Sequence, residues 1–244
     1  MVRLILKMRD FLKKILYPNK YNSEVYISFL RKKGVEIGNG CVIYSPNHTE
    51  IDIQRPHMLK IGNYVKITSG VTILTHDYSR SVLCNMRQYG NVGEAANTVI
   101  GNNVFVGINS IILMGAHIGN NTIVGAGSVV SGEFEDNVVI AGNPAKVVCS
   151  LESFYEKRKS KEISAAKEYV TLWRNKYQRD PTIEEMTNAF SWLYLPREIE
   201  TFTRHDKLFR LRGVDLDMYK TMFMESSPIY KSFEDFLRDC NDND

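Results

Sequence analysis

Residues 100–129 read, in sixes, Ile-Gly-Asn-Asn-Val-Phe, Val-Gly-Ile-Asn-Ser-Ile, Ile-Leu-Met-Gly-Ala-His, Ile-Gly-Asn-Asn-Thr-Ile and Val-Gly-Ala-Gly-Ser-Val. The first position of each six is Ile or Val, and the second is usually Gly. A period of six fits neither the 3.6-residue repeat of a helix nor the two-residue alternation of a strand. It predicts a chain that runs as a short strand, turns a corner and runs again with its aliphatic residue pointing inward. Three sixes would make one triangular coil, and stacked coils would share one apolar core.

The register extends in both directions from this stretch. Ile-Gly-Asn-Asn recurs at 100 and 118, which is 118 − 100 = 18 residues, or three sixes. The same pattern begins at 37–42 and resumes at 61–77. Two segments interrupt it: 44–60 is expected to bulge from a coil, and 78–97 is polar and without repeat. A long loop of this kind in a compact domain is usually functional.

The distribution of glycine and tryptophan predicts three parts. Of the 16 glycines, 15 lie between Gly34 and Gly142, whereas Trp173 and Trp192 both follow that region. We therefore expect N-terminal helices at 1–33, a coil domain at 34–148 with the loop 78–97, and a helical extension at 149–244. In the extension, 160–177 is amphipathic, and Thr182 with Glu185 forms the pattern of a capping box at a new helix start.

The coil segment resembles the hexapeptide-repeat acyltransferases. The similarity is carried by Ile-Thr-Ser-Gly-Val-Thr-Ile-Leu-Thr-His-Asp at 67–77, by the loop that follows, and by Ile-Ala-Gly-Asn-Pro-Ala-Lys-Val-Val at 140–148. It covers roughly 35–148 and is closest to maltose, galactoside, capsular and lipopolysaccharide O-acetyltransferases. The resemblance implies a mainly β protein built on a left-handed parallel β-helix with helical additions. It also implies an acetyl-CoA-dependent O-acetyltransferase of polysaccharide biosynthesis, which modifies a hydroxyl of a sugar or polysaccharide precursor.

His76 holds the position of the family's catalytic histidine, at the end of a coil and just before the loop. An imidazole titrates near neutral pH, so it can take the proton of an acceptor hydroxyl and later protonate the leaving thiolate. The resemblance makes Asn47 a residue that binds the acceptor. Asp52, Glu50 and Asp77 are candidates to bind acceptor hydroxyls or to orient the ring, and Asp52 is preferred.

The resemblance also implies a binding site for acetyl-CoA as co-substrate. The backbone N–H of Ile108 would stabilise the oxyanion, and Phe105 would flank the donor. The remaining donor residues are Ala126, Ser131 and Gly132 along the pantetheine arm and Lys146 at the phosphates. Cys149 replaces a second basic residue that relatives often carry. The family forms homotrimers with active sites between subunits, so we expect a homotrimer in which the loop 78–97 reaches a neighbour.

The net charge of +3 originates in the first part of the chain. Residues 1–33 carry 9 Lys and Arg against 2 acidic residues, which gives 9 − 2 = +7. Residues 1–16 form a basic amphipathic pattern, which suits either a cap over the open first coil or peripheral contact with an anionic membrane. Charges at Lys7, Arg9 and Asp10 interrupt the apolar run, so no signal peptide is expected. We expect a cytoplasmic protein with reduced cysteines, at the inner membrane surface if the helix contacts lipid.

Other functions fit the residues less well. A zinc carbonic anhydrase needs three histidine ligands, but Thr122 stands five residues after His117 where a second would be required. No metal site is therefore expected, and the tail lacks the basic character of a nucleic-acid binder. The alternatives that stay open are N-acetylation of a nucleotide-linked amino sugar, O-acetylation of an antibiotic, and a non-catalytic β-helix scaffold.

Overall fold

The computed structural model describes residues 8, 12–209 and 213–241. The chain divides into two compact units, Met1–Phe154 and Tyr155–Asp244. The first unit contains the coil domain and the second contains most of the helical extension.

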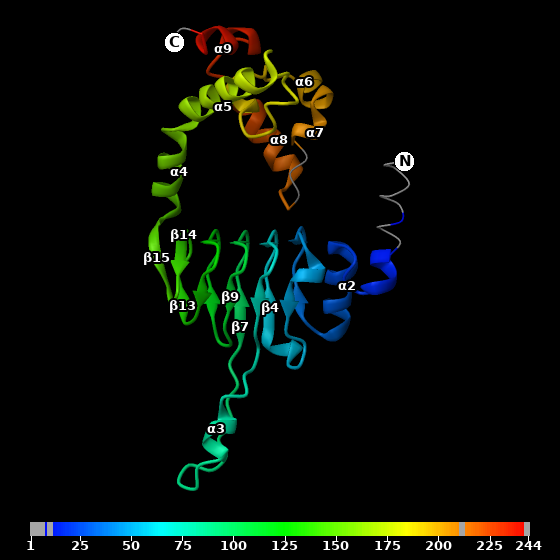
Figure 1. Ribbon diagram of the computed structural model, residues 1–244, viewed down its shortest axis with the longest axis vertical. Helices are drawn as coiled ribbons and strands as arrows, with labels where there is room; N and C mark the ends of the chain where they lie inside the picture. The colour runs from blue at the N-terminus through cyan, green and yellow to red at the C-terminus, as the bar shows by residue number, and fades with distance from the viewer. Residues whose placement is uncertain (1–7, 9–11, 210–212, 242–244) are drawn as a thin grey trace. The chain divides into compact units, whose positions relative to one another are not determined.

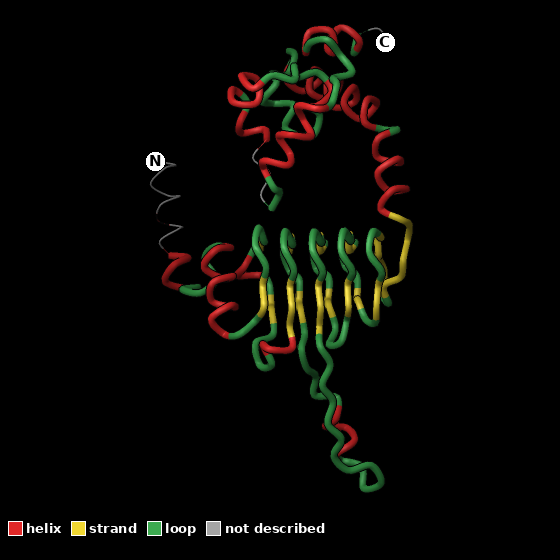
Figure 2. The backbone as a smooth tube through the Cα atoms, turned by 180° about the vertical axis from the view of Figure 1, so that it is seen from behind, coloured by secondary structure: helices red, strands yellow, loops and turns green. Residues whose placement is uncertain are grey.

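The first unit is a parallel β-helix with three sheets of very short strands (Figures 1 and 2). The first sheet contains β1 (Glu36–Ile37), β4 (Leu59–Ile61), β7 (Thr98–Ile100), β10 (His117–Ile118) and β13 (Glu133–Phe134). The second contains β2 (Val42–Ile43), β5 (Lys66–Ile67), β8 (Phe105–Val106), β11 (Ile123–Val124), β14 (Val138–Gly142) and, antiparallel to β14, β15 (Ala145–Ser150). The third contains β3 (Glu50–Ile51), β6 (Thr72–Ile73), β9 (Ile111–Ile112) and β12 (Val129–Val130). The predicted β-helix with helical additions is confirmed.

The pairing register follows the six-residue repeat. Ile100 pairs with Ile118, Val106 with Val124, and Ile112 with Val130. The two residues of each pair are 18 positions apart in all three sheets, so one complete coil contains 18 residues. These six side chains are all at most 2% exposed and form the core of the β-helix. The aliphatic first position of each six therefore points inward, as the sequence predicts.

Glycine and asparagine shape the corner between the first and second sheets. A Cβ atom on Gly62 would lie 2.6 Å from the carbonyl oxygen of Gly101 in the next coil, so this position has no room for a side chain. Asn102 Oδ1 accepts a hydrogen bond from the backbone N–H of Asn63 at 2.8 Å, and Asn120 Oδ1 accepts one from Asn102 N–H at 2.8 Å. This ladder satisfies backbone donors that the strands leave unpaired at the corner. The recurring Ile-Gly-Asn-Asn phrase is the sequence of this corner.

The first interruption, 44–60, is more regular than its sequence suggests. It contains strand β3, which pairs with β6 and completes the third side of the first coil. Two 3-10 turns, η1 (Pro46–His48) and η2 (Pro56–Met58), flank it and begin at prolines, which fix the backbone of a first helical turn. The bulges are thus confined to the two turns.

Helix α2 (Ser23–Lys33) covers the open first coil. Its Tyr26, Ile27 and Leu30 are buried in the same apolar cluster as the inward residues of the β-helix. The expected N-terminal cap is therefore formed by α2, whereas most of the segment 1–16, namely 1–7 and 9–11, lies outside the described residues. Within 12–16, Leu12, Ile15 and Leu16 are exposed. The alternative of membrane contact through this segment stays a prediction.

The loop 78–97 leaves the β-helix between β6 and β7 and projects away from it (Figure 1). It carries a short helix, α3 (Arg80–Cys84). Its base is tied to the first coil because Arg55 Nη1 donates a hydrogen bond to the Glu94 carbonyl oxygen at 2.7 Å. The loop exposes Tyr78, Val82, Tyr89 and Val92.

The extension is helical and has an aromatic core, which includes Phe209, Phe223 and Phe236. Its elements are α4 (Leu151–Lys159), α5 (Glu162–Tyr177), η3 (Ser191–Leu193), α6 (Ile199–Arg204), α7 (Asp206–Phe209), α8 (Leu216–Glu225) and α9 (Phe233–Asp239). The reciprocal capping-box hydrogen bonds form, Thr182 N–H to Glu185 Oε2 at 2.8 Å and Glu185 N–H to Thr182 Oγ1 at 3.3 Å. No α-helix begins at this capping box. Residues 183–189 form turns, and Thr187 has a φ of 62°.

Candidate active site

His76 and Asp52 meet at the corner between the third and first sheets. Strand β3 pairs with β6 so that Ile51 lies opposite Ile73, and the backbone N–H of Asp52 donates to the Ile73 carbonyl oxygen at 2.9 Å. Both strands end immediately after this pair. The Asp52 carboxylate therefore lies in the first coil directly beside residues 75 and 76 of the second coil, where its Oδ2 atom hydrogen-bonds to His76 Nδ1.

Three other groups hold the Asp52 carboxylate. Thr75 donates to Oδ2 from its backbone N–H at 3.0 Å and from its hydroxyl at 2.5 Å, and the Gln54 N–H donates to Oδ1 at 2.8 Å. Burial acts to raise the pKa of Asp52, but hydrogen bonds from Thr75, Gln54 and His76 outweigh it and lower the pKa to about 2. The carboxylate is thus an anion at neutral pH, with its side chain 7% exposed.

The ionised carboxylate determines which ring nitrogen of His76 can act as a base. An ionised carboxylate only accepts hydrogen bonds, so Nδ1 carries the hydrogen and the lone pair of the neutral ring is on Nε2. The Tyr78 ring stands edge-on to the imidazole, with centroids 5.1 Å apart and planes at 90°. The Tyr78 hydroxyl donates to Gln54 Oε1 at 3.1 Å. These contacts orient the ring at the base of the loop.

The other two proposed acceptor residues are placed differently. The Asp77 carboxylate is exposed and accepts hydrogen bonds from the Ser79 N–H at 2.9 Å and from the Ser79 hydroxyl at 2.7 Å. Hydrogen bonding by Ser79 lowers the pKa of Asp77. Asn47 lies in η1, at the corner between the second and third sheets. Of the two aspartates that were candidates to orient His76, Asp52 is the one in hydrogen-bond contact with the ring.

The proposed donor residues occupy two corners and one sheet. Ile108 and Ala126 lie at the corner between the second and third sheets, with the Gly127 N–H donating to the Ile108 carbonyl oxygen at 2.8 Å. Ser131 and Gly132 follow β12 at the corner between the third and first sheets, on the side of His76. Phe105, on β8, and Lys146, on β15, belong to the second sheet and are exposed.

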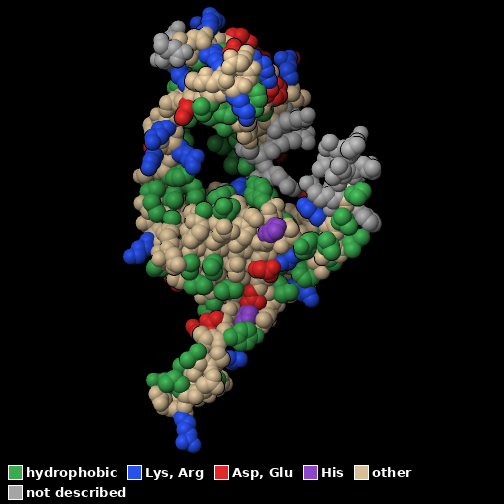
Figure 3. Space-filling view, in the orientation of Figure 1, with side chains coloured by type: hydrophobic (Ala, Val, Ile, Leu, Met, Phe, Trp, Pro, Cys, Tyr) green, Lys and Arg blue, Asp and Glu red, His purple; other side chains and the backbone are tan. Residues whose placement is uncertain are grey.

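These positions mean that one chain does not bring all the proposed site residues together. The third sheet separates the corner that holds His76 from the corner that holds Ile108 and Ala126. Figure 3 shows histidine and acidic side chains on the face of the β-helix near the departing loop. The His76–Asp52 pair and the proposed oxyanion donor are thus on opposite edges of the third sheet.

Sequence reasoning missed three supporting residues, Thr75, Gln54 and Tyr78. For Thr75 the sequence offered one signal, because this polar residue directly precedes His76. In the structure Thr75 is fully buried. A buried hydroxyl needs a hydrogen-bond partner, and the partner is the Asp52 carboxylate. Gln54 and Tyr78 carry no such signal, because both are exposed.

The remaining histidines have other surroundings. His48 and His57 are exposed, His117 Nε2 lies 2.9 Å from the Asn97 carbonyl oxygen, and His205 Nδ1 lies 3.0 Å from Glu184 Oε1. Within the described part of the chain, no group of three His, Cys, Asp or Glu side chains is placed to hold a metal ion. Among the same residues, no helix combines the length and the apolar character that a membrane crossing requires.

A β-helix of six-residue repeats, with a histidine–carboxylate pair at the base of a protruding loop, defines the class as a hexapeptide-repeat transferase. Residues 97–132 match the family described as bacterial transferase hexapeptide (six repeats). The chain is 47% identical to Protein CapG of Staphylococcus aureus over 128 residues, which cover 52% of this chain and 73% of CapG. The chain therefore belongs to the hexapeptide-repeat acetyltransferase family.

Two further comparisons describe its relatives. The chain is 33% identical over 120 residues to a putative lipopolysaccharide biosynthesis O-acetyl transferase, WbbJ, of Escherichia coli (strain K12), which cover 46% of this chain and 61% of WbbJ. It is also similar to the solved structure of a galactoside acetyltransferase in complex with coenzyme A. That likeness has 28% identity and a TM-score of 0.34, and it covers 48% of this chain and 55% of the other.

Proposed function

We propose that the protein transfers the acetyl group of acetyl-CoA to a hydroxyl group of a sugar or polysaccharide precursor, with His76 as the general base. The observation that carries the proposal is the partly buried hydrogen bond between His76 Nδ1 and the ionised Asp52 carboxylate. The similarity to WbbJ, whose name places it in lipopolysaccharide biosynthesis, supports a saccharide acceptor.

The proposed chemistry uses Nε2 of His76 first as a base and then as an acid, while Nδ1 stays bonded to Asp52. Nε2 takes the proton of the acceptor hydroxyl as its oxygen bonds to the thioester carbonyl carbon. The resulting imidazolium is stabilised by Asp52, which holds the Nδ1 hydrogen throughout. When the carbon–sulfur bond breaks, Nε2 returns the proton to the departing thiolate, so the products are an acetyl ester and free coenzyme A. General acid–base assistance of this kind typically contributes roughly 10²–10⁴ in rate.

The donor would lie at the corner between the second and third sheets. The backbone N–H groups at this corner include that of Ile108, which we propose as the group that stabilises the oxyanion. Ala126, at the same corner, would lie along the pantetheine arm of the donor. Ser131 and Gly132 would contact the same arm, Phe105 would flank it, and Lys146 would face the phosphates. We further propose that 34–148 with the loop 78–97 forms the acetyltransferase domain and that 149–244 is an accessory extension.

We propose that the active enzyme is a homotrimer. The separation of His76 from Ile108 across the third sheet supports this, because a second copy can supply the missing corner. The exposed apolar residues of the loop also support it, since such side chains on a projecting segment commonly mark an interaction site. Light scattering should therefore give three times the mass of the 28.0 kDa chain. A fully active monomer would contradict the proposal.

Lys146→Ala should raise the KM for acetyl-CoA roughly five-fold at low salt and leave kcat unchanged. An exposed charge that binds donor and transition state equally contributes about 1 kcal/mol, and salt screens it. Titrations of acetyl-CoA at low and high ionic strength measure both effects. Lys60→Ala, which removes an exposed lysine from the first sheet, is the control. An unchanged KM at low salt would mean that the phosphates bind elsewhere.

The function itself is tested by release of the coenzyme A thiol from acetyl-CoA in the presence of different acceptors. The panel should contain oligosaccharides, nucleotide-linked amino sugars and antibiotics. Acceptor-dependent thiol release with a neutral saccharide, and an ester product by mass spectrometry, would support the proposal. Activity only with an amino sugar would identify an N-acetyltransferase instead, and activity only with an antibiotic would identify a resistance enzyme.

A further inference from the structure

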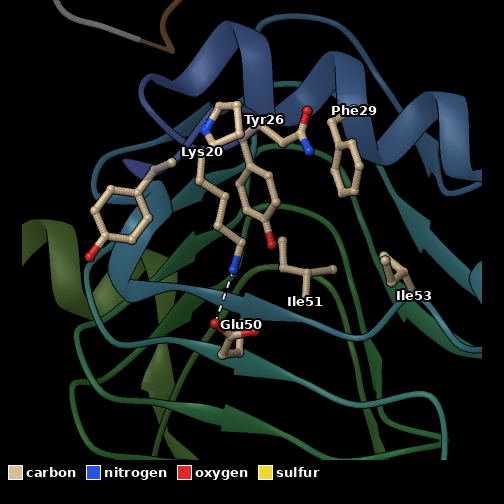
Figure 4. A pocket seen from close by; sticks show the side chains of 9 residues that line it. Lys20, Tyr26, Phe29, Glu50, Ile51 and Ile53 are labelled. Carbon is tan, nitrogen blue, oxygen red and sulfur yellow. Dashed lines mark hydrogen bonds and ion pairs between the residues drawn. The ribbon is translucent and has the colours of Figure 1, made fainter. Parts of the chain in front are cut away.

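A cavity of about 330 Å³ opens between the N-terminal segment, helix α2 and strand β3 (Figure 4). Small-molecule sites range from roughly 300 to 1,000 Å³, so its volume suits one small ring. Its walls come from the residues that precede α2, from α2 itself and from Glu50, Ile51 and Ile53 of the first coil. None of these residues belongs to the catalytic pair or to the proposed donor site.

The lining combines aromatic and polar groups. Tyr17 and Phe29 contribute rings that are not fully buried. Lys20 Nζ forms an ion pair with Glu50 Oε1 at 2.9 Å and also donates to the Thr49 carbonyl oxygen at 3.0 Å. In Figure 4, Lys20 extends past the Tyr26 ring to Glu50, while Phe29 and Ile53 lie on the other side of that ring. Rings beside fixed charged groups present both an apolar surface and hydrogen-bonding partners.

The cavity adjoins the catalytic pair along the chain. Ile51 and Ile53 line it, and the residue between them is Asp52, which contacts His76. Asp52 is one residue from each of these two, and consecutive Cα atoms are about 3.8 Å apart, so its backbone adjoins the cavity wall. A ligand held there would be on the same coil as Asp52.

We propose that this cavity is an acceptor subsite that holds a pyranose ring of the saccharide whose hydroxyl is acetylated. The proposal rests on the function proposed above and names the part of the chain that would select the sugar. The C–H face of the ring would pack on Tyr17 and Phe29, and its hydroxyl groups would bond to Lys20 and Glu50. An acyl chain fits less well, because it would remove the Lys20–Glu50 pair from water without replacing its hydrogen bonds.

The test uses octyl β-D-glucopyranoside below its micellar concentration and saturation-transfer NMR on the His76→Ala protein. This probe carries a pyranose and an alkyl chain in one molecule, and the variant binds without reacting. Strong transfer to the pyranose protons that is lost in His76→Ala/Tyr17→Ala is the expected result. Transfer confined to the octyl protons, or transfer that Tyr17→Ala does not change, would overturn the proposal. Because no chemistry is involved, this result is independent of whether the protein transfers acetyl groups.

Kinetics supply the second measurement on the otherwise unaltered chain. With the sugar acceptor identified by thiol release, Tyr17→Ala and Glu50→Gln should each raise its KM about ten-fold, which corresponds to 1.4 kcal/mol. The kcat at saturation and the KM for acetyl-CoA should stay the same. Tyr155→Ala, which removes an exposed tyrosine of α4, is the control. Glu50→Gln keeps the test decisive if Tyr17→Ala unfolds, and unchanged acceptor KM in Glu50→Gln would overturn the subsite.

Discussion

His76→Ala should lower kcat for acetyl transfer by roughly 10²–10⁴ and leave the thermal unfolding temperature nearly unchanged. The variant loses the base that takes the proton of the acceptor hydroxyl and the acid that protonates the thiolate. Its side chain is 13% exposed and lies at a corner of the coil, outside the apolar core, so the fold does not depend on it. Steady-state thiol release with saturating acetyl-CoA and acceptor measures the effect.

The matched control is His57→Ala. His57 is an exposed histidine in η2 of the same unit, and its replacement should leave kcat within a factor of two or so. If His76→Ala keeps its activity, another group is the base and the assignment of the site is wrong. If both variants lose activity equally, the loss reflects damage to the fold.

Asp52→Asn should lower kcat by roughly 10²–10⁴, although asparagine has almost the same shape as aspartate. The carboxylate accepts from Thr75, from Gln54 and from His76 Nδ1, whereas an amide brings an N–H₂ group that can only donate. The ring would then lose the partner that keeps its hydrogen on Nδ1 and stabilises the imidazolium. The measurement is the kcat of the variant with the KM for both substrates.

Asp77→Asn is the control for charge next to His76. It removes the same charge one residue from His76, but the Asp77 carboxylate bonds to Ser79 in the base of the loop. We expect a small change in kcat. Equal losses in both variants would show that the negative charge near the ring matters and that the Asp52 contact does not. A fully active Asp52→Asn enzyme would remove Asp52 from the mechanism.

The lowered pKa of Asp52 also has a consequence for stability. A group whose pKa is lower in the folded than in the unfolded chain stabilises the fold above the unfolded value, near 3.9, and this contribution is lost as the pH falls through about 2. The shift corresponds to about 2 kcal/mol at neutral pH. Asp52→Asn removes this titrating group. The free energy of unfolding of the variant should therefore fall less than that of the unaltered protein between about pH 4 and pH 2.

The core of the β-helix could be predicted from particular residues. Ile100 and Ile118 fill equivalent positions 18 residues apart, and they pair directly in the first sheet. Asn103 and Asn121, which the repeat places at a corner, have φ values of 53° and 52°. The prediction succeeds because each coil meets only its neighbours, so local residue type decides the local turn. The position of His76 before the loop follows from the same register.

Other features could not be predicted locally. The segment 44–60 has no repeat in its sequence, yet β3 forms there because β6 offers it a sheet edge. The capping box at Thr182 predicts a helix, but the packing of the second unit gives turns after it.

The sequence by itself determined the β-helix, the length of a coil, the place where the loop leaves it and the histidine beside that loop. These depend on short-range choices of glycine, asparagine and aliphatic residues, which act within one coil or between two. Only the tertiary structure decided that Asp52 contacts His76, that Thr75 holds the carboxylate, and that Ile108 lies across the third sheet. The pair is 24 residues apart, six more than the 18 of a regular coil. Asp52 and His76 still meet because η2 takes up extra residues between them, which leaves β3 paired with β6.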